Sequence, residues 1–134
     1  MKIYESGENY LETILILEER TGSVRSIDIA NELGYSKPSV SRAMGILKRE
    51  GFIKIDEDGI ITLTKQGNKT ASAIYERHVF IADYLERALG VNRETATEDA
   101  CRIEHIISDE SFDRMKSWLA RDRNNDAAEK HENT

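Results

Sequence analysis

The order of elements between residues 26 and 63 constrains this chain most. SIDIANEL and KPSVSRAMGILKRE are two amphipathic helix patterns separated by a turn at Gly34, and FIKIDEDGIITLT follows them. Glycine after a helix favours a left-handed C-terminal turn, and Asp-Gly between two alternating segments favours a two-stranded hairpin. The sequence therefore predicts helix, turn, helix and hairpin, in that order.

This order is that of a winged helix-turn-helix. In such a unit the second helix fits the DNA major groove, while the first helix and the hairpin wing contact phosphates. The second helix carries short polar or basic side chains at its start and on its outward positions. Arg42 is suited to bind guanine edges, and Ser39 is suited to bind a base or a phosphate. The basic residues near the end of the helix are suited to bind the DNA backbone. The candidate DNA-binding residues are Ser36, Lys37, Pro38, Ser39, Ser41, Arg42, Lys48 and Arg49.

Net charge argues against nucleic acid at first, because the chain carries a formal charge of −6. Between residues 24 and 54, however, the sequence contains six basic residues and only three acidic ones. Charges beyond a Debye length of roughly 10 Å are largely screened, so this local excess governs the interaction with phosphate. The acidic wing tip, 56–58, is expected to stay off the phosphates. The alternative is that the basic segment is only a solvated surface.

The rest of the sequence reads as helices. A first helix follows Ser6, a long one spans 65–89 before Gly90, another spans about 94–107, and Ser108 caps a last one. We expect a mainly α fold with three parts: a winged helix-turn-helix with a small β-hairpin wing at 1–64, a helical metal-binding and dimerisation domain at 65–122, and a frayed polar tail at 123–134. The apolar faces of the last two helices serve either dimerisation or the monomer core; among the candidates are Phe112, Met115, Trp118 and Leu119.

The segment DACRIEH, 99–105, holds the only cysteine of the chain. On a continuous helix, Cys101, Glu104 and His105 share one face. The apolar residues on the opposite side are Ala100, Ile103, Ile106 and Ile107. A solvated face is the simpler interpretation for the charged residues, but an exposed free thiol is unusual. Thiolate, carboxylate and imidazole at this spacing suit a divalent transition metal. To form a metal site, these three side chains need further ligands from elsewhere in the chain.

Candidates for those ligands lie in two other helices. His78 lies on the long helix, and Asn9 and Glu12 share a face of the first helix at i, i+3. If the first helix packs over the others, metal would tie the two halves of the chain together. Taken singly, His78 is also compatible with an ordinary core or surface histidine.

The motifs together resemble the diphtheria toxin repressor family of metal-dependent transcriptional repressors. The similarity lies in ENYLETILILEE, SKPSVSRAMGILKREG, LTKQG, ERH and, most specifically, DACRIEHIISDE, and it covers about residues 5–121. Membership implies a metal-loaded homodimer that binds a palindromic DNA operator of iron or manganese homeostasis genes. The chain resembles a short member that ends without the SH3-like domain of many relatives.

The resemblance also assigns roles to the candidate ligands. Cys101, Glu104 and His105 match the primary site of iron-responsive members, His78 matches a ligand of both branches, and Glu12 matches a carboxylate of the manganese branch. Asn9 departs from the methionine or aspartate of relatives. At a second, ancillary site Ala82 and Thr97 replace a glutamate and a histidine, with Asp83 and Glu98 as neighbouring substitutes.

Metal choice follows from ligand softness. A cysteine thiolate disfavours Mn(II) relative to Fe(II), and the manganese branch carries a carboxylate at that position. We therefore expect Fe(II), with Mn(II) as the alternative, and binding of Zn(II), Co(II) or Ni(II) in vitro.

Two other functions remain open: a metal-independent winged-helix regulator that senses thiol oxidation at Cys101, and an iron-binding helical protein without DNA. An enzyme is not expected, because no glycine-rich phosphate loop or Ser/His/Asp constellation is present, and no small-molecule substrate is inferred. With one cysteine, no leader and no long apolar run, the sequence predicts a cytoplasmic protein without a membrane partner.

Overall fold

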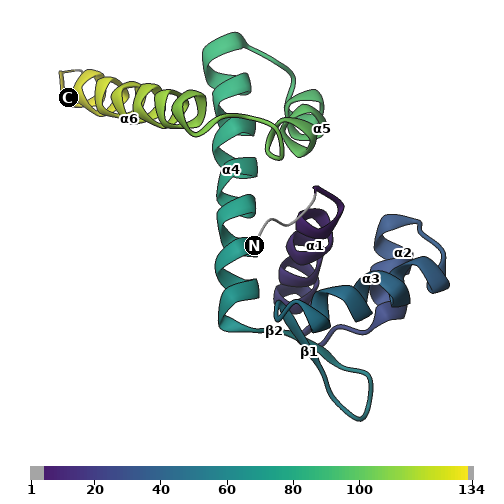
Figure 1. Cartoon of the computed structure of the whole chain (residues 1–134). Helices are drawn as coiled ribbons and strands as arrows, with labels where there is room; N and C mark the ends of the chain where they lie inside the picture. The colour runs from purple at the N-terminus through teal and green to yellow at the C-terminus, as the bar shows by residue number, and fades with distance from the viewer. Residues whose placement is uncertain (1–4, 133–134) are drawn as a thin grey trace. The chain divides into compact units, whose positions relative to one another are not determined.

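The computed structural model describes residues 5–132 and contains six helices and one β-hairpin within that range (Figure 1). They form two compact units, Met1–Tyr75 and Glu76–Thr134, whose boundary lies inside one long helix. In chain order the elements are α1 (Glu5–Thr21), α2 (Ser26–Leu33), α3 (Lys37–Arg49), β1 (Ile53–Ile55), β2 (Ile61–Leu63), α4 (Lys65–Leu89), α5 (Arg93–Ile103) and α6 (Asp109–Glu132).

The first unit is the predicted winged helix-turn-helix. Gly34 adopts φ 69° after α2, a left-handed conformation that glycine allows without a Cβ penalty. Ser36 then caps α3, because its Oγ accepts a hydrogen bond from the backbone N–H of Ser39 at 3.3 Å. Local signals in the sequence were therefore sufficient to determine where α2 ends and where α3 begins.

The wing is an antiparallel hairpin in which Ile53 pairs with Leu63 and Ile55 with Ile61. Its turn is stabilised by Asp56, whose Oδ1 accepts hydrogen bonds from the N–H groups of Asp58 and Ile60, both at 2.9 Å. The hairpin projects beyond the helices of its unit (Figure 1). The predicted fold class, mainly helical with a hairpin wing, is confirmed.

One apolar core holds the first unit together. It takes residues from all three helices, both strands and the start of α4, and most are fully buried. Gly67 in the first turn of α4 lies against the hairpin side of this core, where a Cβ atom would come 1.9 Å from the carbonyl oxygen of Phe52. The largest fully buried side chains of the core are Leu11, Ile14, Ile29, Met44, Ile53 and Ile61.

The second unit consists of the later part of α4 with α5 and α6. Its core is Ile81, Leu85, Ala96, Ala100 and Phe112, with other apolar residues packed around it. Ion pairs also join α4 to α6, among them Lys116 with Glu76 at 2.9 Å and Arg123 with Asp83 at 3.1 Å. Exposed pairs contribute about 0–1 kcal/mol each, so burial of the apolar side chains is the larger stabilising effect.

Three expectations about the helices were wrong. Ser6 lies inside α1 and does not cap it. Helix α5 ends at Ile103 and does not reach residue 107. The segment 123–134, expected to be a frayed tail, continues α6 as far as Glu132, while residues 133–134 lie outside the described part. A helix can continue through polar sequence when its residues have good helix propensity, as the Ala, Glu and Lys residues here do.

The apolar residues of the last helix divide between two roles. Phe112 and Leu119 are buried, whereas Met115 and Trp118 are half-buried. Within the described residues, no helix has the length and apolar character needed to cross a membrane.

Candidate metal centre and nucleic-acid interface

The outward surface of α3 and its N-cap Ser36 carry all eight predicted DNA-binding residues. Each of them is exposed, while Val40, Met44 and Leu47 of the same helix are buried in the core. The hydroxyl of Ser36 donates to Oγ of Ser39 at 2.8 Å, so these two side chains are held together at the start of the helix. The helix therefore presents a polar and basic surface at the place where a groove-binding helix needs one.

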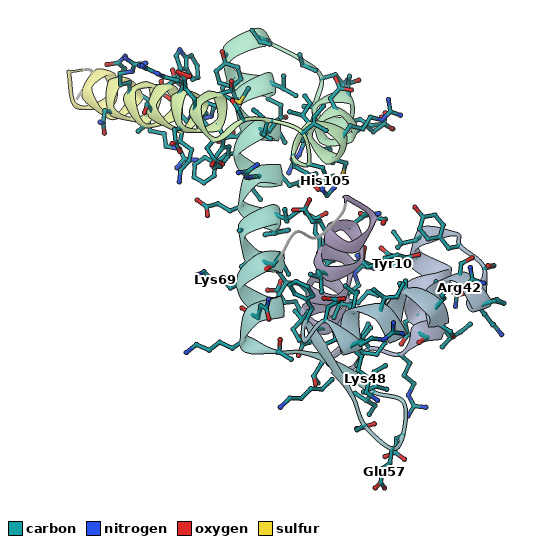
Figure 2. The ribbon with its side chains drawn as sticks, viewed as in Figure 1. Tyr10, Arg42, Lys48, Glu57, Lys69 and His105 are labelled. Atoms are coloured by element: carbon teal, nitrogen blue, oxygen red, sulfur yellow. The ribbon has the colours of Figure 1, made fainter. Side chains whose placement is uncertain are left out.

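The charges near α3 are unevenly distributed. Arg42 and Lys48 extend from α3, whereas Glu57 lies at the tip of the wing (Figure 2). Helix α3 contains no acidic residue. The positive charge is thus on the helix and the negative charge at the far end of the wing, as the sequence predicted.

Sequence reasoning missed one residue on this surface. Ile46 is 47% exposed although it is a large apolar side chain. Its spacing from Arg42, four residues, already placed it on the outward face of the helix.

The candidate metal ligands of the second unit come from α4 and from the end of α5. His78 projects from α4, Cys101 lies in the last turn of α5, and Glu104 and His105 follow it. Because α5 ends at Ile103, these residues do not form the continuous helical face that the sequence suggested. The chain turn after α5 instead directs Glu104 inward, where its side chain is completely buried.

Distances link these four side chains in pairs. Nδ1 of His78 lies 3.0 Å from Oε2 of Glu104 and 3.6 Å from Sγ of Cys101. Nε2 of His105 lies 3.3 Å from Oε1 of Glu104. The buried carboxylate thus lies between two imidazoles, and the thiol of the exposed Cys101 is close to one of them. The structure brings all four side chains close together, and their role as metal ligands stays a prediction.

The donor set fits a divalent transition metal in its chemistry. Oε1 of Glu104 is buried and receives no hydrogen bond from the described residues, which is costly for a carboxylate oxygen unless a cation is near. Imidazole, thiolate and carboxylate together suit Fe(II), Zn(II) and related ions. However, no three such side chains of the described residues are arranged so that they could hold an ion together. Metal binding would require them to turn from one another toward a common centre.

The ligands proposed from the first helix lie in the other unit. Glu12 is buried, with 6% exposure, and Asn9 is half-buried one turn earlier, where its carbonyl accepts a 2.8 Å hydrogen bond from Thr13. Their role as ligands stays a prediction.

The position of the ancillary site lacks strong ligands. Ala82 packs against the core of the second unit, and the hydroxyl of Thr97 donates to the carbonyl of Arg93 at 2.8 Å. The carboxylate of the neighbouring Asp83 forms ion pairs with both Arg87 and Arg123. It would have to leave these partners to bind a metal.

Known protein families match both halves of the chain. The N-terminal DNA-binding domain of iron-dependent repressors matches residues 2–59, and their metal-binding and dimerisation domain matches residues 64–130. The chain belongs to the iron-dependent repressor family. The resemblance inferred from the sequence motifs is therefore confirmed.

Individual members of this family differ in how much of their length is matched. An uncharacterised HTH-type transcriptional regulator of Methanocaldococcus jannaschii is 33% identical over 116 residues, which are 86% of this chain and 93% of that protein. The diphtheria toxin repressor of Corynebacterium diphtheriae is 31% identical over 117 residues, 87% of this chain and 52% of that protein.

A solved structure gives the same result. The manganese regulator SloR matches with a TM-score of 0.75 and 30% identity, over 90% of this chain and 55% of that chain. The chain thus spans about half the length of SloR and of the diphtheria toxin repressor. Iron and manganese both occur among the metals named for the family and its members.

Proposed function

We propose that this chain is a metal-dependent transcriptional repressor of the cytoplasm. Divalent metal, Fe(II) in preference to Mn(II), enables its homodimer to bind a palindromic operator of metal-homeostasis genes. The observation that carries the proposal is the buried carboxylate of Glu104 between His78 and His105, in a chain that also carries a winged helix-turn-helix. Family membership supports the same combination of a metal-binding and a DNA-binding unit.

The proposed metal ligands are His78, Cys101, Glu104 and His105, to which the sequence resemblance adds Asn9 and Glu12. A bound metal would place a positive charge beside the buried carboxylate of Glu104. The thiolate of Cys101 is the soft donor, and softness favours Fe(II) or Zn(II) over Mn(II). Cys101 is exposed, so it is accessible to an incoming ion without unfolding of the core.

The proposed DNA contacts divide by chemistry. Arg42 and Ser39 lie one turn apart on the outward face of α3, where they would read base edges. Lys48 and Arg49, in the last turn of the helix, would hold the phosphate backbone. Two copies of α3 related by a twofold axis would read two half-sites, which is why a dimer implies a palindromic operator.

The proposed dimer face lies on α4 and α6. Met115 and Trp118 line a hollow with Tyr84, whose ring meets that of Trp118 edge to face at 5.5 Å between centroids. Half-buried aromatic residues on a helix surface are enriched at protein interfaces. The buried Phe112 and Leu119 are assigned to the core of the protomer. Sedimentation should show a dimer for the wild type and monomers for Trp118→Glu; a wild-type monomer with and without metal would contradict the dimer.

The proposed control of DNA binding is linkage. If metal binds better to the conformation that also fits the operator, metal raises the affinity for the operator. The operator then raises the affinity for metal by the same factor. The sequence places candidate ligands on both sides of the winged helix-turn-helix, at Glu12 and from His78 onward.

The test is the affinity for DNA with and without metal. A duplex selected by the protein from a random-sequence library in the presence of Mn(II) serves as the probe, and binding is measured by fluorescence anisotropy. We expect tight binding with anaerobic Fe(II) or with Mn(II), and its loss on chelation. Equal affinities with metal and with chelator would overturn the proposal.

One further function is favoured by a specific observation, the exposure of Cys101 beside His78. A thiol-sensing regulator would lose DNA binding with peroxide and would not respond to chelator. In contrast, an iron-binding protein without DNA would select no duplex at all. The same anisotropy experiment separates these outcomes from the repressor.

A further inference from the structure

We propose that Gly45 and Ile46 form an apolar strip on α3 that reads thymine methyl groups of the operator. The inference rests on the proposed function and deepens it, since it names a base whose recognition the polar residues of α3 do not explain. Neither residue was among the DNA contacts expected from the sequence.

The first observation is the position of Ile46. It lies four residues after Arg42 and seven after Ser39, spacings that place all three side chains on one side of a helix. The buried residues Val40 and Met44 lie on the other side, in the core of the first unit. Ile46 remains 47% exposed, so its side chain is not needed to complete the core.

The second observation is the glycine beside it. Gly45 lies in the middle of α3, where glycine stabilises a helix less than alanine does. A Cβ atom built on Gly45 would meet no atom of the described residues within 4 Å, and its φ is an ordinary helical one. The fold therefore does not require glycine here. Glycine does allow a close approach of another molecule to the helix backbone.

The surroundings of the strip indicate which molecule approaches. Arg42 precedes Ile46 by one turn, Arg49 follows it by one turn, and both are exposed. Helix α3 contains no acidic residue that would repel phosphate. A partner with negative charge on both sides of an apolar group matches this pattern. In the major groove of DNA the C5-methyl group of thymine is that apolar group, with phosphates on either side.

The experiment removes the methyl group from the DNA and its partner from the protein. The metal-loaded full chain selects a duplex from a random-sequence library, and that duplex is synthesised with thymine or with uracil, which lacks only the methyl group. Wild type should bind the uracil duplex about fourfold more weakly for each methyl group contacted. Ile46→Ala should bind both duplexes equally, at the level of wild type on uracil.

Gly45→Ala tests the close approach. We expect this variant to unfold at a higher temperature than wild type but to bind the selected duplex roughly tenfold more weakly, the size of one lost base contact. Opposite signs for stability and binding would not result from a purely structural role. Ser72→Ala, at an exposed position of α4, is the control and should leave binding of the selected duplex unchanged.

Salt dependence provides a separate readout. Ile46→Ala should leave the slope of log affinity against log salt unchanged, whereas Lys48→Ala should reduce it, because only the lysine contacts phosphate in this proposal.

Two outcomes would overturn the strip. The first is that the wild type selects a duplex, but uracil weakens the binding of wild type and of Ile46→Ala to the same extent, or Gly45→Ala binds as well as wild type. The proposed apolar strip would then be wrong, while the proposed repressor function would remain. If the wild type selects no duplex with metal, the proposed function fails and this inference with it.

Discussion

Nδ1 of His78 on α4 lies 3.0 Å from Oε2 of Glu104, a residue 26 positions later that follows α5. This contact joins α4 to the turn after α5 through a side chain that has no exposed surface. A carboxylate in such a place requires positive charge or hydrogen-bond donors nearby, because burial removes its hydration. The consequence is that Glu104 should be the residue of the second unit on which metal binding depends most.

Glu104→Gln tests this dependence. Wild type should gain about 2.7 kcal/mol of stability when Mn(II) is present at a hundred times its dissociation constant, because metal binds only the folded chain. The amide is neutral and a poor metal ligand, so the variant should lose this gain. Thermal unfolding with and without Mn(II) measures it. Glu94→Gln, exposed at the opposite end of α5, should keep the full gain; an equal gain in both variants would exclude Glu104 as a ligand.

Cys101→Asp tests the origin of the metal preference. Replacing the soft thiolate by a hard carboxylate should shift relative affinity toward Mn(II) and away from Fe(II), by roughly tenfold or more if it resembles other changes around metal sites. Anaerobic calorimetric titration of both metals gives the ratio. With Co(II) as a probe, the thiolate-to-metal absorption band of wild type should be absent from Cys101→Ser. An unchanged Fe(II)/Mn(II) ratio together with an unchanged Co(II) spectrum would show that the thiol is not a ligand.

Gly67→Ala tests the contact between α4 and the wing. A Cβ atom at this position would lie 1.9 Å from the carbonyl oxygen of Phe52 and 2.9 Å from its carbonyl carbon. Backbone atoms cannot rotate away as a side chain does, so the hairpin or the helix must shift. We expect a loss of about 1–3 kcal/mol or more in the free energy of unfolding. Urea unfolding measures it, and a midpoint equal to that of wild type would show that no such contact exists in solution.

The raised pKa of Tyr10 predicts a loss of stability at alkaline pH. Burial, and secondly the nearby Tyr35, raise the pKa of Tyr10 above the ordinary value of 10.0. The folded chain thus holds the phenol proton more tightly than the unfolded chain does, so the free energy of unfolding falls as pH rises from 10.0 through the raised pKa. Urea unfolding across this range should show a shallower decline for Tyr10→Phe than for wild type. Parallel declines in the two proteins would assign the effect to other groups.

Much of the fold could be predicted because it depends on local signals. Gly34 permits the left-handed turn after α2, Ser36 caps α3, and Gly90 follows α4 at the predicted end. Each of these signals acts within a few residues, so it is legible without knowledge of the packing. The exposed polar and basic surface of α3 was predictable for the same reason, since the buried and exposed sides of the helix follow from its periodicity.

The sequence by itself also selected the side chains proposed as metal ligands, because residue type restricts metal chemistry and the CRIEH block is specific. Only the tertiary structure decided how they meet. Helix α5 ends at Ile103, Glu104 is buried, and Ile106, expected on the apolar side, is 75% exposed. Likewise, Phe112 enters the core while Trp118 lines a surface hollow. Burial at these positions depends on packing against α4, a helix distant in sequence, and no local pattern contains that information.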